Sequence, residues 1–128
     1  KVFLATGDGS FHMNMNEMVT LKSYDIPVII MVFNNTVLGM VRQWQKLFYG
    51  RRFSQTDPHR ATDFVAAAKA FGIEGFSVSE EKDIMPTLKK AVELNAPVLI
   101  DFHISPDANV LPMIPPGKDV DDMILELD

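Results

Sequence analysis

The sequence predicts an α/β fold of three layers, in which helices cover both faces of a mostly parallel sheet. Short apolar runs typical of buried strands, stretches of helical periodicity between them, and turn residues at the junctions support this prediction. The repeated order strand, helix, strand is typical of parallel sheets with crossover helices. The 128 residues fit one domain and contain no internal repeat.

The first part of the chain contains two apolar runs that we expect to be buried strands. Val2 to Ala5 is followed by the turn Gly7-Asp8-Gly9, and Val28 to Phe33 is uniform enough for the centre of the sheet. Between the runs, Ser10 to Tyr24 carries apolar residues at helical spacing, and Ser10 is the expected N-cap. This stretch is therefore predicted to be a crossover helix.

Shorter elements follow in the rest of the chain. The expected ranges are a helix at Leu38 to Lys46, a functional loop at Leu47 to Arg60, a helix at Thr62 to Phe71, a strand at Gly75 to Val78, a helix capped by Ser79 with Ile84, Leu88, Ala91 and Val92 on its apolar face, and a strand at Pro97 to Phe102. Ser105 to Lys118 contains four prolines and cannot be regular, whereas Val120 to Leu127 is expected to form a terminal helix.

Composition excludes several classes of function. The net charge is -5, with 17 acidic and 12 basic side chains and no basic stripe, so nucleic acid is not an expected partner. The longest apolar stretch, Ile26 to Phe33, is far shorter than the roughly 20 residues that span a bilayer. Cysteine is absent, which fits a reducing compartment such as the bacterial cytoplasm. Because Lys1 already lies in a predicted strand, we expect the chain to lack an upstream strand and further domains.

Two polar clusters follow the first two predicted strands. Gly7-Asp8-Gly9 comes after one strand and Asn34-Asn35 after the next, separated by the 24 residues from Ser10 to Phe33. In open parallel sheets, ligands bind outside the carboxyl ends of the strands, so one crossover brings both clusters to the same crevice. Glycines allow close approach to a ligand, and the oxygens of Asp8 and Asn35 suit magnesium shared with phosphate. The clusters therefore predict a diphosphate and metal site.

A simpler interpretation is that Asp8-Gly9 forms only a hairpin turn, since this dipeptide often connects antiparallel strands. The residues that follow have helical rather than alternating periodicity, which favours the site. Met13 could either contact the cofactor or pack within the helix layer, whereas Met15 is expected in the core. The histidines show neither ligand spacing nor a nucleophile partner, and we expect structural or surface roles for them: His12, His59 and His103.

Gly-Asp-Gly followed after this interval by paired asparagines resembles the thiamine diphosphate motif. The resemblance implies that Asp8 and Asn35 bind magnesium through their side chains and Val37 through its carbonyl oxygen. It also implies that the turn at Gly7 admits the diphosphate, which the main chain of Gly9, Ser10 and Phe11 approaches. Short motifs of this kind gain weight from their strand and helix context.

The run from Asn34 to Tyr49 resembles the acetohydroxyacid synthase form of this region, and Val110-Leu111-Pro112-Met113 is similar to the tail of that family. The likeness covers nearly the whole chain. It implies that Met40, Val41 and Trp44 line the substrate channel near the thiazolium ring, where the indole favours the larger acceptor ketoacid. Without the flanking match, Trp44 alone would favour a core aromatic or a contact with a partner over a substrate channel.

The family decarboxylates pyruvate and condenses the hydroxyethyl unit with a second 2-ketoacid, pyruvate or 2-ketobutyrate, in branched-chain amino-acid biosynthesis. The resemblance also implies FAD in the full-length enzyme, a homodimer or other homo-oligomer, and a regulatory subunit. Domains that carry the activating glutamate and FAD are not within these residues, so we expect negligible turnover from them alone. Two alternatives remain: another thiamine diphosphate carboligase or decarboxylase, and a noncatalytic assembly module.

Overall fold

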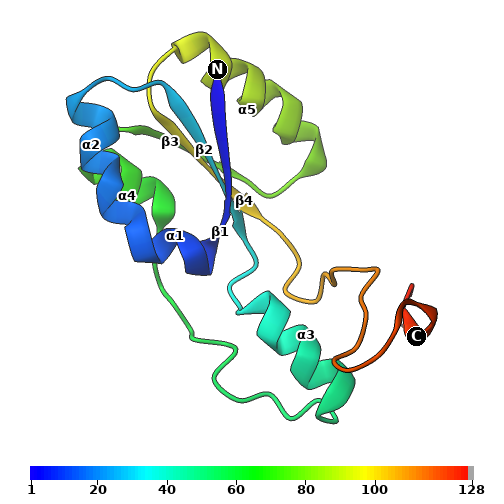
Figure 1. Cartoon of the computed structure of the whole chain (residues 1–128). Helices are drawn as coiled ribbons and strands as arrows, with labels where there is room; N and C mark the ends of the chain where they lie inside the picture. The colour runs from blue at the N-terminus through cyan, green and yellow to red at the C-terminus, as the bar shows by residue number, and fades with distance from the viewer. Residues whose placement is uncertain (127–128) are drawn as a thin grey trace.

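The computed structural model describes residues 1–126, and a four-stranded sheet forms its centre (Figure 1). The strands are β1 (Val2–Gly7), β2 (Val28–Asn34), β3 (Glu74–Val78) and β4 (Val98–His103), in the order β1-β2-β4-β3. Each neighbouring pair is parallel. The predicted parallel sheet is confirmed, and the Asp8-Gly9 hairpin is excluded because a helix and a parallel strand follow it.

Helices cover both faces of this sheet, as predicted for three layers. Three short helices, α1 (Asp8–Asn14), α2 (Met18–Ser23) and α4 (Phe64–Ala70), lie on one face, and α5 (Glu81–Leu94) lies on the other (Figure 1). Asp63 caps α4 by accepting a hydrogen bond from the backbone N–H of Ala66 at 2.8 Å. This contact satisfies one of the free N–H groups at the helix start.

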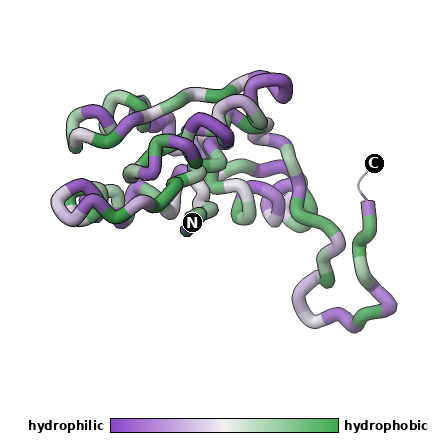
Figure 2. Tube along the Cα trace, turned by 90° about the horizontal axis from the view of Figure 1, so that it is seen from above, coloured by the Kyte–Doolittle hydropathy of each residue, from purple (hydrophilic) through white to green (hydrophobic). Residues whose placement is uncertain are grey.

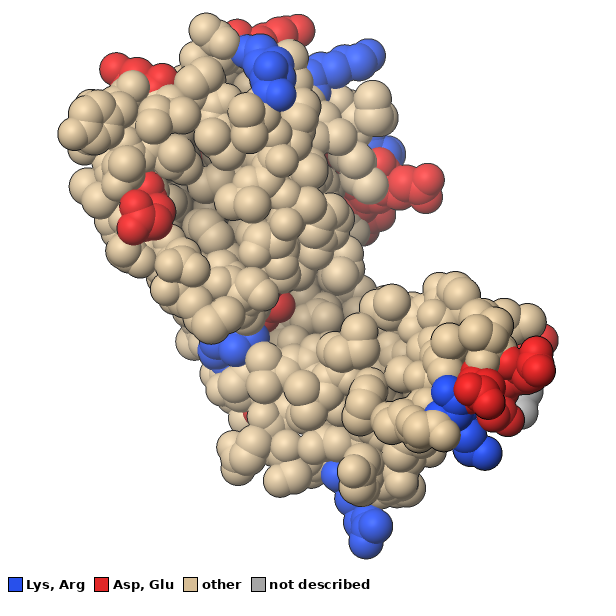
Figure 3. Space-filling model, viewed as in Figure 1, with Lys and Arg blue, Asp and Glu red and all other residues tan. Residues whose placement is uncertain are grey.

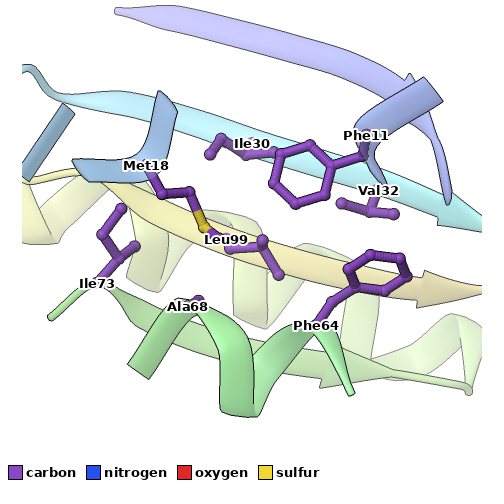
Figure 4. Close-up of a cluster of buried hydrophobic side chains, with 8 residues drawn as sticks. All are labelled: Phe11, Met18, Ile30, Val32, Phe64, Ala68, Ile73 and Leu99. Atoms are coloured by element: carbon purple, nitrogen blue, oxygen red, sulfur yellow. The ribbon is translucent and has the colours of Figure 1, made fainter. Parts of the chain in front are cut away.

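The two central strands carry the core because apolar residues point to both of their faces. Ile30 and Val32 of β2 and Leu99 of β4 pack with α1, α2 and α4 in one cluster (Figure 4). Their sequence neighbours Ile29, Val98 and Ile100 pack against α5 in a second cluster. Successive strand residues alternate between faces, so an uninterrupted apolar run fills both layers.

The first strand differs from the prediction, since β1 lies at the edge of the sheet and is exposed. Val2, Phe3 and Leu4 keep 60%, 47% and 44% of their surface accessible. β1 pairs with β2 on one side only, and its other side has no strand neighbour among residues 1–126. Its apolar sequence is that of a buried strand, but this part of the polypeptide does not cover it.

The first crossover is not one helix. α1 ends at Asn14, a 3₁₀ turn spans Met15–Glu17, and α2 follows. Asn14 has a non-helical backbone (φ −136°, ψ 17°), in line with the low helix propensity of asparagine. The expected N-cap was also wrong, because α1 begins directly at Asp8 and Ser10 lies inside its first turn. Met15 packs against the core, as expected.

The fifth helix begins one residue later than predicted. Glu80 is its N-cap rather than Ser79, and Glu81 and Asp83 occupy the first turn, where carboxylates favour the positive end of the helix. Ala91 is buried in the second cluster, with the rest of the predicted apolar face packed around it. Asn95 ends the helix in the left-handed conformation, at φ 46°.

The C-terminal segment leaves the sheet and runs beside α3 (Gly39–Phe48), away from the other helices (Figures 1 and 2). The side chain of Gln43 donates to the carbonyl of Val110 at 2.9 Å and accepts from its N–H at 2.8 Å. Val120–Asp122 is a 3₁₀ turn, and Ile124 pairs with Met113 in an antiparallel bridge. The predicted helix from Val120 to Leu127 is therefore wrong over the described part, and Leu127 lies outside it.

The described part of the chain contains no helix with the length and apolar character needed to cross a membrane.

Replacing Leu99 should test the central role of β4. Its side chain is 0% exposed, so Leu99→Ala leaves a cavity in the first cluster and should lower the free energy of unfolding by about 2 to 5 kcal/mol. Denaturant unfolding of the chain measures this loss. Leu125→Ala, at a side chain 70% exposed, is the control and should change stability by less than about 0.5 kcal/mol. Equal losses in the two variants would contradict the assignment of the core.

Candidate functional site

The loops after β1 and β2 meet at one cavity of about 500 Å³. Gly7 pairs with Phe33 in the parallel register, so the residues that follow both strands emerge side by side. The predicted site residues among its lining are Gly7, Asp8, Gly9, Ser10, Met13, Asn35, Val37 and Met40. The segment after β4 closes another side with Ile104, Ala108, Asn109 and Val110. In Figure 3 the visible face is hollowed between the sheet and the lobe that α3 and the C-terminal segment form.

Asp8 is held at the start of α1, with 3% of its surface exposed. Nη2 of Arg60 donates to its Oδ2 at 2.7 Å. Nδ1 of His12 lies 2.7 Å from the carbonyl oxygen of Asp8, which can only accept, so this nitrogen donates. Nε2 of His12 lies 2.7 Å from Oγ1 of Thr62. The side chain and the main chain of Asp8 are thus both tied to the segment before α4.

The turn after β2 is held by its own two asparagines. Oδ1 of Asn34 accepts from the N–H of Thr36 at 3.2 Å, and Oδ1 of Asn35 accepts from the N–H of Val37 at 3.2 Å. Thr36 has φ +63°, a left-handed conformation that a β-branched residue rarely adopts. These hydrogen bonds stabilise a strained turn, which is common where backbone geometry serves binding.

The donor groups and the space around them fit a hard cation beside a diphosphate. Asp8 offers a carboxylate, Asn35 an amide and Val37 a carbonyl at the same cavity, and hard cations prefer such oxygens. Among the described residues no group of three or more His, Cys, Asp or Glu could hold a metal ion. A Cβ at Gly39 would lie 2.7 Å from Nδ2 of Asn35, so a side chain there would displace the Asn35 amide.

Three predicted residues do not line this cavity. The side chain of Phe11 lies in the core, 6% exposed, in contact with Phe64. Val41 is half exposed on α3. Trp44 packs edge-on to Phe48 and lines a separate apolar groove together with Tyr49, Pro115, Pro116 and Lys118. The structure therefore brings Met40 to the cavity with Asp8 but places Trp44 farther along α3.

Asp8 also lines a second, polar cavity of about 520 Å³. Asp101 at the end of β4 is 4% exposed, accepts from Nδ2 of Asn34 at 3.4 Å and has Nε2 of His103 at 3.5 Å from its Oδ2. Burial raises the pKa of Asp101 above its usual value, and the Asn34 hydrogen bond and the charge of His103 oppose this rise only in part. Asp101 thus joins the sheet to the asparagine turn.

Sequence patterns do not reveal Arg60 or Asp101. Arg60 lies in an aperiodic loop, 52 positions from the aspartate that it contacts. Asp101 interrupts an apolar strand, and that interruption was the one available signal, because a buried carboxylate needs partners. Two histidines have the structural or surface positions expected of them. His12 bridges Asp8 and Thr62, and His59 is exposed.

Comparison with known proteins assigns the fold and the glycine-aspartate turn to a family. Residues 1–102 match the family described as thiamine pyrophosphate enzyme, C-terminal TPP binding domain. The chain belongs to this family. The TPP-binding domain is also similar in structure to a thiamine diphosphate-dependent 4-hydroxybenzoylformate decarboxylase of Rhodococcus jostii RHA1. The TM-score is 0.76 at 28% identity, over 82% of this chain and 20% of the decarboxylase.

Sequence relatives of this TPP-binding domain are acetolactate synthase large subunits. It is 45% identical over 91% of its length to a probable large subunit of Methanocaldococcus jannaschii, of which it covers 20%. It is 42% identical over 96% of its length to the acetolactate synthase of Mycobacterium bovis, of which it covers 21%. The chain therefore spans about a fifth of the length of these relatives and is homologous to part of their TPP-binding domain.

The pKa of Asp101 gives a prediction of pH dependence. The folded state holds this proton more tightly than the unfolded state, so the wild-type chain loses stability as the pH rises from near 3.8 through the raised value. The side chain of Asp101→Asn does not titrate, so the variant should gain stability relative to wild type as the pH rises through this range. Above the raised pKa, the difference in unfolding free energy between the two proteins should stay constant. Unfolding measured from about pH 3.5 to about pH 8 checks this expectation, with Glu74→Gln, at an exposed carboxylate at the start of β3, as control. The expectation would be contradicted if the stability of Asp101→Asn relative to wild type did not change with pH, or fell as the pH rose.

Proposed function

We propose that the cavity between β1, β2 and α3 anchors the diphosphate of thiamine diphosphate through a magnesium ion. The observation that carries this proposal is the convergence of Asp8 and Asn35 on one cavity in a TPP-binding domain. Both side chains come from the carboxyl ends of adjacent parallel strands, where ligands of open α/β sheets bind.

In this proposal each residue has a stated task. Asp8, the Asn35 amide and the Val37 carbonyl hold the metal, and the hydrogen bond that Val37 donates to Asn35 keeps the last two in one turn. Gly7 and Gly9 leave room for phosphate oxygens, and the main chain of Ser10 and Phe11 follows in α1. Met13 and Met40 supply apolar contacts at the same cavity. The bound cofactor supplies stabilised carbanion chemistry.

For the complete protein we propose the acetolactate synthase reaction, in which pyruvate is decarboxylated and condensed with a second 2-ketoacid. Identities of 41–45% to acetolactate synthases over most of the chain support this choice over a decarboxylase, for which the similar solved structure is 28% identical. The role of this chain is to bind and orient rather than to donate or accept protons. We propose FAD, a homo-oligomer, a regulatory subunit and a cytoplasmic setting only for the complete protein, and negligible turnover for this chain alone.

Met40, Val41 and Trp44 are the proposed wall of the substrate channel. All three lie on α3, which begins next to Asn35 and carries Trp44 away from the metal site toward the C-terminal segment. A channel along this helix would give substrates an apolar path to the cofactor. The indole, 37% exposed beside Phe48, offers a flat apolar surface to a ketoacid side chain.

Removing the Asp8 carboxylate should abolish anchoring of the cofactor. We expect Asp8→Ala in the complete enzyme to weaken binding of magnesium and thiamine diphosphate at least about tenfold, because a metal ligand is lost. Isothermal titration calorimetry measures this change. Asp83→Ala, at an exposed carboxylate on α5, is the matched control and should bind as wild type. Unchanged binding by Asp8→Ala would favour a noncatalytic assembly module instead.

Replacing Trp44 should alter the choice of acceptor. Apolar contact with the indole favours the extra methylene of 2-ketobutyrate. Trp44→Ala in the complete enzyme should therefore shift the acceptor preference toward pyruvate by about tenfold. Competition between the two ketoacids, read as the ratio of their condensation products, measures the shift. Tyr24→Ala, at a side chain 76% exposed at the end of α2, is the control. An unchanged ratio would disfavour the synthase and support another thiamine diphosphate enzyme.

A further inference from the structure

Arg60 forms a direct contact with Asp8, the proposed metal ligand. Its Nη2 lies 2.7 Å from Oδ2 of Asp8, and both residues line the second polar cavity. Asp8 also lines the cavity with Asn35 and Val37. The Asp8 carboxylate therefore contacts a guanidinium and also belongs to a residue that lines the proposed cation cavity.

The guanidinium also lies against the glycine turn. A Cβ built on Gly9 would have Nη2 and Nη1 of Arg60 at 3.6 and 3.9 Å, so the group packs beside the proposed diphosphate turn. Its side chain is 23% exposed, and its Nε is buried without a hydrogen-bond partner among the described residues. Arg60 is thus only partly satisfied by Asp8, and the contact lacks the bidentate geometry of the strongest arginine pairs.

Electrostatics gives this contact a consequence for ligand binding. Burial of a carboxylate such as that of Asp8 is costly without a partner, and the contact with Arg60 offsets this cost. A divalent cation on the same carboxylate makes the guanidinium redundant and is repelled by it. A diphosphate carries enough negative charge to offset both cations.

We propose that Arg60 holds the place of the divalent cation at Asp8 in the metal-free chain, so that the cation binds well only together with a diphosphate. This inference rests on the proposed function, because it takes Asp8 as a ligand of the cation. The task of Arg60 is to prevent tight binding of a lone cation and to favour the cation–diphosphate pair.

Equilibrium dialysis of the 128-residue chain against Mn²⁺, with and without inorganic pyrophosphate, tests this proposal; Mn²⁺ suits oxygen sites of this kind. Arg60→Gln should bind Mn²⁺ alone about tenfold more tightly than wild type, within the usual range of coupling between neighbouring sites. With pyrophosphate present, the Mn²⁺ affinities of Arg60→Gln and wild type should differ by less than about threefold. Arg60→Lys keeps the charge and should bind lone Mn²⁺ as wild type does. Arg52→Gln, at an exposed arginine that donates to the Tyr49 carbonyl, is the control.

The outcomes separate this inference from the function on which it rests. The role of Arg60 is overturned if Arg60→Gln binds Mn²⁺ no more tightly than wild type. It is also overturned if pyrophosphate leaves the difference in Mn²⁺ affinity between the two proteins unchanged. Asp8→Asn should lose Mn²⁺ binding; if it binds as wild type, or if no variant binds Mn²⁺ under either condition, the proposed metal site itself fails. If Arg60→Gln unfolds without metal, refolding in Mn²⁺ supports the exchange of one cation for another, and failure to refold overturns it.

Discussion

The parallel pairing of β1 with β2 is the constraint on which the site depends. It places Gly7 beside Phe33, so the glycine turn and the asparagine turn leave the sheet at the same level. A strand register is fixed where alternate side chains must enter different layers, and β2 sends Ile29 to one core cluster and Ile30 to the other. Packing of the hydrophobic core therefore determines where the polar donors meet.

Buried charge at the end of the sheet is the second determinant. Asp8 and Asp101 are both almost inaccessible, and each depends on a residue distant in sequence, Arg60 and Asn34 respectively. A low-dielectric surrounding makes such contacts strong when complete and costly when broken. The same strand ends that expose backbone for ligand binding thus carry side-chain contacts that fix the loops in place.

The fold was predictable from sequence because its signals are local. Uniform apolar runs predicted β2 and β4, and the two polar motifs predicted that Gly7, Asp8, Gly9 and Asn35 share one cavity. Helix caps were less predictable: Gly7, three residues before Ser10, is the N-cap of α1, and Glu80, next to Ser79, is the N-cap of α5. The exposure of β1 and the contact between Arg60 and Asp8 depend on tertiary neighbours, which no short sequence window records.

Gln43 has a mechanical consequence for the outer wall of the site. Its amide meets both backbone groups of Val110, 67 positions away, much as a strand residue meets its neighbour. Because Gln43 is 3% exposed, water does not readily replace these contacts. Any swing of the segment that carries Asn109 must therefore either break the paired contacts together or drag α3, with Met40 on it, in the same direction. A wider opening on this side of the cavity would therefore require α3 and this segment to move as one hinged body.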